Sequence, residues 1–170
     1  MIICIVSDSH DHTDLLSAAV ASPQLQGAQA VIHCGDIIGA NTLRGLQQFG
    51  LPVHAVHGNN LGDFMALTRL TSQPGSVVRY HGDHADFELA GKRLFVTHYP
   101  HIARGMACTG DYDLVCCGHS HEALIERIDN VRGGTTLMVN PGTIAGLGAP
   151  STYVVGDLAA GEFRITPVLA

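Results

Sequence analysis

The sequence begins with a short apolar run that stops at two side chains able to bind a metal ion. Residues 2–6 are all apolar and mostly β-branched, and such a run predicts a strand buried on both faces of a sheet. Asp8 and His10 follow it, separated by Ser9. Beyond the carboxyl end of a strand, where α/β sheets build sites, a carboxylate and an imidazole with this spacing can bind one ion. Both residue types are also common in loops, so the rest of the chain decides what this pair means.

The same arrangement, an apolar run followed by a polar tip, recurs along the chain. Helices predicted over 11–21 and 42–49 separate the first three strands, and this alternation implies right-handed crossovers and a mostly parallel sheet. The later runs with their tips are 30–34 with Asp36, 53–56 with Asn59, 92–97 with His98, and 113–117 with His119 and His121.

The second half of the chain favours strands over helices. Short turns separate runs with strand character, and those after residue 121 are predicted to be antiparallel. These runs are 76–80, 86–90, 92–97, 122–128, 135–140, 152–158 and 162–168. We therefore expect an α/β fold in one domain over residues 1–170, with two packed mixed β-sheets flanked by helices. This is a four-layer αββα sandwich with a metal site at the strand ends.

Composition excludes several classes of protein. A hydrophobic fraction of 46% and a charged fraction of 14% are typical of a compact globular chain and argue against disorder. The formal charge of −6 gives no electrostatic footprint for a protein that sheathes nucleic acid. The five cysteines lie mostly in apolar runs, which indicates buried thiols in a reducing compartment, and no apolar run is long enough to span a membrane. We expect a cytoplasmic protein. The sequence does not determine its oligomeric state, and a homo-oligomer is one of the options.

The polar tips share a chemistry that is typical of metal centres. Imidazole nitrogens, carboxylate oxygens and one amide oxygen, without thiolates, favour borderline divalent metals: manganese first, then iron, zinc, nickel or cobalt. There are too many ligands for one tetrahedral ion, but enough for two ions if one carboxylate bridges them. Two ions about 3.5–4 Å apart suit hydrolysis of phosphoesters. The candidate ligands are Asp8, His10, Asp36, Asn59, His98, His119 and His121.

Five short motifs stand at these strand ends in a fixed order. They are Asp8-Ser9-His10, Gly35-Asp36, Gly58-Asn59-Asn60, Thr97-His98 and Gly118-His119-Ser120-His121. The series resembles that of the calcineurin-like metallophosphoesterases, and the chain is similar in size to their small single-domain phosphodiesterase branch of bacteria and archaea. Asn140-Pro141-Gly142-Thr143 also looks like a turn common in that branch. The resemblance extends from Asp8 to about residue 158.

The resemblance implies a dinuclear-metal-dependent phosphodiesterase in which a metal-bridging hydroxide attacks phosphorus in line. Asp36 would bridge the two ions, and the substrate would be a small phosphoester. The first ion would be held by Asp8, His10 and His121, and the second by Asn59, His98 and His119.

Two positions depart from the family pattern. Many family members have a histidine after the Gly-Asn pair, where it can protonate the leaving group, but this chain has Asn60. An amide can contact the substrate phosphate but has no proton to give near pH 7. The fourth motif often reads Thr-His-Gly-His, whereas here Tyr99 and Pro100 follow His98, and His101 is a possible substitute for the missing histidine.

Other interpretations stand beside this one. A phosphomonoesterase and a nucleotide-polyphosphate hydrolase are the alternatives within enzymes. A non-catalytic scaffold similar to a retromer subunit is the alternative of another class, although a scaffold has no reason to keep seven ligands. His33, His54 and His57 are predicted to support the site or to pack at the core edge, and residues 81–84 to form a solvated hairpin turn.

Overall fold

The computed structural model describes residues 1–22 and 27–169, which form two β-sheets with helices on their outer faces. The first sheet has the strand order β11-β10-β1-β2-β3-β4, and the second has the order β5-β6-β7-β9-β8. The strands are β1 (Ile2–Val6), β2 (Ala28–His33), β3 (Val53–Ala55), β4 (Val78–Tyr80), β5 (His84–Leu89), β6 (Lys92–Thr97), β7 (Leu114–Cys116), β8 (Ala123–Asp129), β9 (Thr135–Pro141), β10 (Thr152–Asp157) and β11 (Glu162–Pro167). The helices are α1 (Thr13–Ala21), α2 (Ala40–Arg44), the 3-10 helix η2 (Gly45–Phe49), α3 (Phe64–Thr71) and α4 (Pro100–Thr109).

Strand β1 is buried on both faces, as its apolar run predicts. Because side chains alternate along a strand, Cys4 and Val6 join one core while Ile3 and Ile5 join another. The first of these cores lies between the first sheet and helices α1 to α3, and the second lies between the two sheets. Both faces of β1 are therefore covered, and only its ends are free to carry polar groups.

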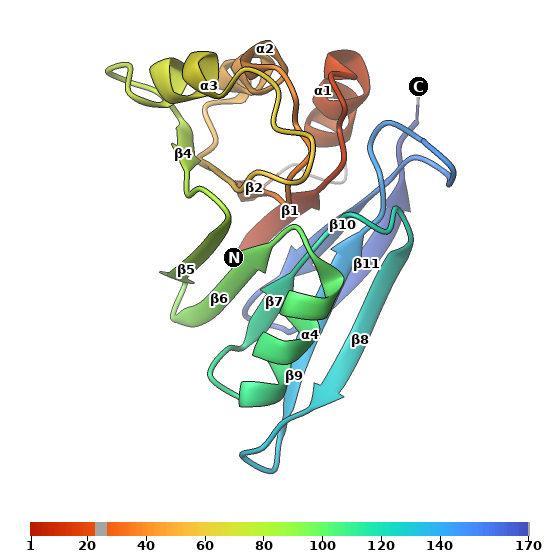
Figure 1. The fold of residues 1–170 in the computed structure, drawn as a ribbon. Coiled ribbons are helices and arrows are strands. Elements are labelled where there is room, and N and C mark those ends of the chain that lie inside the picture. The colour runs from red at the N-terminus through yellow and green to blue at the C-terminus, as the bar shows by residue number, and fades with distance from the viewer. Residues whose placement is uncertain (23–26, 170) are drawn as a thin grey trace.

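Three cores separate four layers (Figure 1). The third core lies between the second sheet and α4, where Ala103 and Ala107 of the helix pack against Phe95 and Val115. Helices α1, α2 and α3 gather over the first sheet, and α4 lies against the second (Figure 1). The predicted αββα sandwich of two mixed sheets is confirmed.

The structure contains two helices, α3 and α4, that the sequence did not predict. Helix α3 begins after Asp63, whose carboxylate caps it by accepting a hydrogen bond from the Ala66 N–H at 2.9 Å. Helix α4 begins with Pro100 in its first turn, a position that suits proline. The predicted helix over 42–49 begins earlier, at Ala40, and its second half is the 3-10 helix η2.

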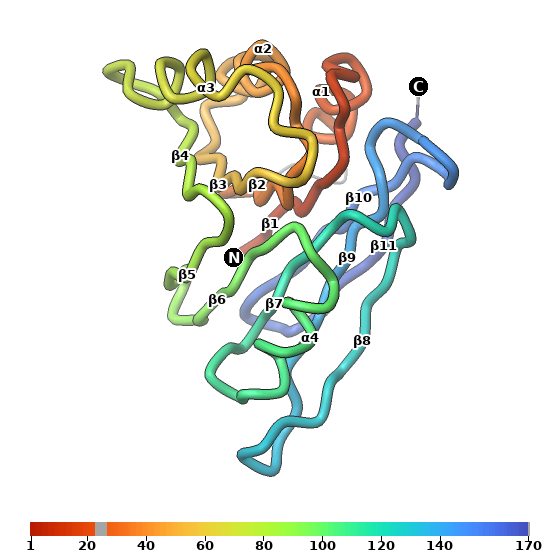
Figure 2. The backbone as a smooth tube through the Cα atoms, in the orientation of Figure 1, coloured from red at the N-terminus to blue at the C-terminus, as the bar shows by residue number. Residues whose placement is uncertain are grey.

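The strand pairing differs from the expectation in two places. Strand β4 pairs in parallel with β3 in the first sheet, whereas β5 pairs with β6 in the second. Residues 81–83 therefore cross from one sheet to the other, as Figure 2 shows, and the hairpin turn predicted over 81–84 is wrong. Strand β9 is antiparallel to β8 as expected, but it is also parallel to β7.

The parallel strands point their carboxyl ends toward one edge of the sandwich. Strands β1, β2 and β3 are parallel neighbours in the first sheet, and β6 and β7 are parallel neighbours in the second. Each predicted ligand follows the carboxyl end of one of these five strands. Among the helices of the described residues, none is long and apolar enough to cross a membrane.

Candidate metal centre

The structure brings Asp8, His10 and His121 together, as the expectation for the first ion requires. The Nε2 atom of His121 lies 3.1 Å from Oδ1 of Asp8, and Nε2 of His10 lies 3.8 Å from the same oxygen. Ligand atoms of these three residues lie within 4.8 Å of one another. Residues that follow β1 and β7 therefore meet at one point.

The residues expected around the second ion also meet. Oδ1 of Asn59 lies 3.1 Å from Nε2 of His98 and 2.9 Å from Nδ1 of His119. Nε2 of His98 lies 3.4 Å from Oδ1 of Asp36 and 3.9 Å from Oδ1 of Asp8. Asp8, Asp36 and His98 form a second group of converging ligand atoms, so Asp8 belongs to both groups.

The hydrogen bonds of the imidazoles are suited to holding a cation between the groups. The second nitrogen of His98 donates to the carbonyl oxygen of Cys34 at 2.8 Å, and that of His121 donates to the carbonyl of Leu147 at 2.7 Å. A ring that carries its only proton on Nδ1 presents the lone pair of Nε2 to an oxygen, Asn59 Oδ1 for His98 or Asp8 Oδ1 for His121, that is also an acceptor. Two acceptors in contact repel each other unless both bind one cation, and the donated N–H bonds orient the rings for this.

His10 supplies a further sign that the group fits a metal. Its Nε2 atom is buried and has no hydrogen-bond partner among the described residues, although it lies 3.7 Å from Oδ2 of Asp36. A buried polar atom without a partner is unfavourable. A divalent cation held by the surrounding carboxylates and imidazoles would satisfy it, so the residues present fit the divalent metals predicted from the ligand types.

The backbone at the ligands is strained. Five of the seven candidates have φ between 40° and 70°, in the left-handed region that residues other than glycine rarely adopt. Backbone hydrogen bonds between loops hold this conformation: the Asp8 N–H donates to Gly35 at 3.0 Å, and the His10 N–H donates to Asp36 at 3.0 Å. Such strain concentrates at functional sites. The five residues are Asp8, His10, Asp36, His119 and His121.

Two glycines allow the ligands to approach closely. A Cβ at Gly58 would lie 2.2 Å from Oδ1 of Asp36 and 2.7 Å from the ring of His98. A Cβ at Gly118 would lie 1.9 Å from Oγ of Ser7 and 2.7 Å from Oδ2 of Asp8. Both positions therefore require a residue without a side chain.

Asp36 is held ionised by its surroundings. Its burial would raise the pKa of the carboxyl, but hydrogen bonds from Asn60 and the nearby His98 and His10 outweigh this and hold the pKa below its usual value. The Asn60 N–H donates to Oδ1 at 2.9 Å, and the Asn60 side chain donates to Oδ2 at 2.6 Å. The predicted contact of Asn60 with a substrate phosphate stays a prediction.

Asn140 and Thr143 hold the ligand loops, a role that the sequence pattern did not predict. The side-chain amide of Asn140 donates to the Gly118 carbonyl at 2.9 Å and to Ser120 Oγ at 3.0 Å. The Thr143 hydroxyl donates to the Asp8 carbonyl at 3.1 Å. The Asn-Pro-Gly-Thr turn is thus a support for two of the ligand segments.

The other histidines lie outside the converging groups of the described residues. The ring of His33 accepts from the Gly35 N–H, bonds Ser9 Oγ at 2.9 Å, and stays neutral because burial lowers its pKa to about 3. His54 stacks on Phe87 with ring centroids 4.2 Å apart. The exposed His101 lies on α4, with its ring 5.8 Å from that of Tyr99.

His57 bonds two side chains of the segment around β4. Its two ring nitrogens contact the Tyr80 hydroxyl and the Asp83 carboxylate. These contacts tie the start of the Gly58-Asn59-Asn60 loop to the end of β4, at Tyr80, and to Asp83 in the segment that crosses between the sheets. His57 therefore supports the loop, in line with the expectation for this residue.

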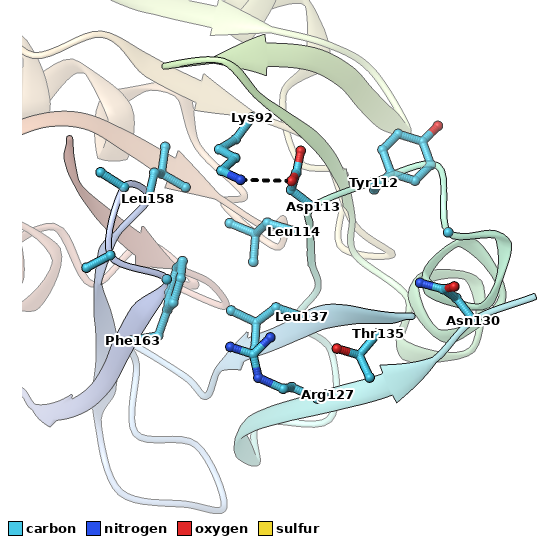
Figure 3. A pocket seen from close by; sticks show the side chains of 14 residues that line it. Lys92, Tyr112, Asp113, Leu114, Arg127, Asn130, Thr135, Leu137, Leu158 and Phe163 are labelled. Carbon is cyan, nitrogen blue, oxygen red and sulfur yellow. Dashed lines mark hydrogen bonds and ion pairs between the residues drawn. The ribbon is translucent and has the colours of Figure 1, made fainter. Parts of the chain in front are cut away.

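A cavity of about 430 Å³ lies at the opposite end of the sandwich (Figure 3). Lys92, Leu114 and Thr135, at the amino ends of β6, β7 and β9, line it together with Arg127 and Phe163. None of the candidate ligands lines this cavity. The candidate metal centre is therefore separate from this cavity and lies at the carboxyl ends of β6 and β7.

Comparisons with known proteins agree with this geometry. A sequence model described as the calcineurin-like phosphoesterase superfamily domain matches residues 1–161. A phosphodiesterase of Methanocaldococcus jannaschii is 29% identical over 168 residues, which cover 96% of this chain and 97% of that protein.

Solved structures show the same architecture. A structure described as a novel archaeal phosphodiesterase has a TM-score of 0.85 and 27% identity, covering 98% of this chain and 99% of its own. The phosphoesterase Yfce from E. coli has a TM-score of 0.66 at 19% identity, covering 99% and 100% of the two chains. Vacuolar Protein Sorting 29 from Cryptosporidium parvum has a TM-score of 0.63 at 16% identity, covering 97% and 95%, and shows the shared fold alone. With its motifs, its fold and the sequence model in agreement, the chain belongs to the calcineurin-like phosphoesterase superfamily.

Proposed function

We propose that this chain is a phosphodiesterase that depends on two divalent metal ions, manganese being the preferred one. The single observation that carries the proposal is the pair of acceptor–acceptor contacts, Asn59 to His98 and Asp8 to His121, which a cation would relieve. The archaeal phosphodiesterases that resemble this chain over almost its whole length support the reaction type.

The residues divide into two ligand sets joined by one carboxylate. Asp8, His10 and His121 would hold one ion, and Asn59, His98 and His119 the other, with Asp36 between them. Two such ions supply an activated water as nucleophile and neutralise charge on the phosphoryl oxygens during in-line displacement. The carbonyls of Cys34 and Leu147 keep the rings of His98 and His121 aimed at the ions.

The substrate that suits this site is a small phosphodiester whose leaving group is a weak base and departs without being protonated. Asn60 occupies the position from which a histidine would protonate the leaving oxygen, and an amide cannot do so. Phosphomonoesters and nucleotide polyphosphates are the second candidates, because metal-assisted attack on phosphorus is common to all of them. A non-catalytic scaffold is disfavoured because five of the seven side chains form two converging groups that share Asp8, and Asn59 with His119 lies against His98.

The test is hydrolysis of bis(p-nitrophenyl) phosphate by protein supplied with Mn²⁺, compared with p-nitrophenyl phosphate and a nucleoside triphosphate. We expect turnover of the diester above that of the monoester, and a loss of at least about 100-fold in Asp36→Asn because the bridging ligand is lost. The matched control is Asp14→Asn at an exposed position of α1. Wild-type protein that binds no metal and hydrolyses none of the three would refute the proposal.

A further inference from the structure

Asn60 donates hydrogen bonds to both oxygens of a single carboxylate. Its backbone N–H lies 2.9 Å from Oδ1 of Asp36, and its side-chain amide nitrogen lies 2.6 Å from Oδ2. Asp36 is only 2% exposed, so water has little access to these oxygens. One residue from the loop after β3 therefore fixes the plane of a carboxylate that follows β2.

The loop that carries Asn60 is itself packed against the segment that carries Asp36. A Cβ at Gly62 would lie 2.1 Å from the carbonyl oxygen of Ile38, so the two segments are in contact there. On its other side the loop is anchored by His57, whose backbone N–H donates to the Gly82 carbonyl at 2.9 Å. Asn60 thus sits between two fixed points and cannot shift relative to Asp36 without breaking one of them.

The orientation given to Asp36 points one oxygen at each ligand set. Oδ1 lies 3.4 Å from Nε2 of His98, a residue of the second set, and Oδ2 lies 3.7 Å from Nε2 of His10, a residue of the first. A carboxylate has about four lone-pair positions, and the two bonds from Asn60 occupy two of them. One lone pair on each oxygen remains for the metal side.

We infer that Asn60 is a positioning residue, which holds Asp36 in the orientation that joins the two ligand sets. The inference rests on the proposed function, because it requires two ions for Asp36 to join. It assigns to the side chain a role in metal binding that is distinct from contact with the substrate. The second N–H of the amide stays available for a phosphate oxygen, so the two roles are compatible.

The test is a titration of metal-free protein with Mn²⁺, followed by calorimetry and by electron paramagnetic resonance. Asn60→Ala removes the side-chain donor, and we expect the affinity for the weaker-bound ion to fall about 10–100-fold, as for other residues that orient metal ligands. The spectrum of an exchange-coupled Mn²⁺ pair should weaken in parallel, a change that general loss of stability would not produce. Asn60→Gln, which keeps the amide at an exposed position, should recover most of the affinity.

Asn41→Ala is the matched control, because Asn41 is an exposed asparagine on α2, close in sequence to the Asp36 loop. Thermal melting of the metal-free variants checks that they are folded. If Asn60→Ala binds two ions as tightly as the wild type and changes only KM or kcat, then Asn60 contacts substrate alone and the inference is overturned. A wild-type chain that does not bind two ions would instead refute the proposed function, and the inference with it.

Discussion

Adding one methyl group at Gly58 should disable the metal centre without removing any ligand. The new Cβ would lie 2.2 Å from Oδ1 of Asp36, 2.7 Å from Cδ2 of His98 and 2.8 Å from its Nε2. The φ of Gly58 is not in the left-handed region, so alanine is compatible with the backbone and the effect is steric. The perturbation therefore acts on two ligands at once.

The magnitude follows from the size of the overlap. Ordinary contacts between carbon and oxygen are about 3.5 Å, so the Asp36 oxygen or the loop must move by about 1 Å. Metal ligands tolerate displacements of about 0.2 Å, and a displacement of about 1 Å costs roughly 100-fold in rate. Overpacking of this kind also costs about 1–3 kcal/mol in the free energy of unfolding.

The assay compares kcat/KM for bis(p-nitrophenyl) phosphate and the number of Mn²⁺ ions bound by Gly58→Ala and by Gly105→Ala. Gly105 lies in α4 with open space around its Cα, so alanine there should leave activity intact and stabilise the helix by up to about 1 kcal/mol. Full activity and full metal content in Gly58→Ala would show that Gly58 is not packed against the ligands as described. The close approach of Asp36 and His98 would then be wrong.

Three further predictions concern stability. Asn140→Ala should lower the free energy of unfolding by about 1–3 kcal/mol in urea titrations, because it leaves the buried Gly118 carbonyl without its donor. Burial, together with His81 and Arg79, lowers the pKa of His54 to about 4, so the folded protein resists a proton that the unfolded chain accepts near pH 6.5. Stability of the metal-free protein should therefore fall as the pH drops from about 6.5 to about 4, and His54→Phe should make this fall shallower, without abolishing it because the pKa of His33 is lowered too, in melting temperatures measured across that range. Removing metal with a chelator should lower the melting temperature, since each site at 100 times its Kd adds about 2.7 kcal/mol, and an unchanged melting temperature would argue against tight binding.

The side chains that gather at the candidate site could be picked out from sequence because their signal is local. Each is a polar residue within four positions of the end of a run such as 2–6 that predicts a buried strand, and parallel strands bring such ends to one edge. The partners that orient the ligands carry no such signal. His98 and His121 are held by the carbonyls of Cys34 and Leu147, and any residue type could supply a backbone carbonyl.

The missed helices have weak periodic patterns. Helix α4 buries only the small Ala103 and Ala107 and contains a glycine, so its apolar face is faint. Helix α3 buries Leu67 and Leu70 but exposes Phe64 and Met65, which blurs the pattern. The sequence signals that mark these helices are the capping residue Asp63 before α3 and Pro100 in the first turn of α4.

The pairing of β4 and β5 could not be predicted either. A short polar segment between two strands looks the same whether it turns back within a sheet or crosses to another. Which partner each strand chooses depends on residues distant in sequence, and the structure pairs β4 with β3 and β5 with β6.

The most direct test of the metal centre is a crystal structure of the chain loaded with Mn²⁺, with anomalous scattering recorded at the manganese edge. We predict two anomalous peaks about 3.5–4 Å apart, with Asp36 between them. One peak should lie beside Asp8, His10 and His121, and the other beside Asn59, His98 and His119. A single peak, or peaks away from these side chains, would contradict the dinuclear centre.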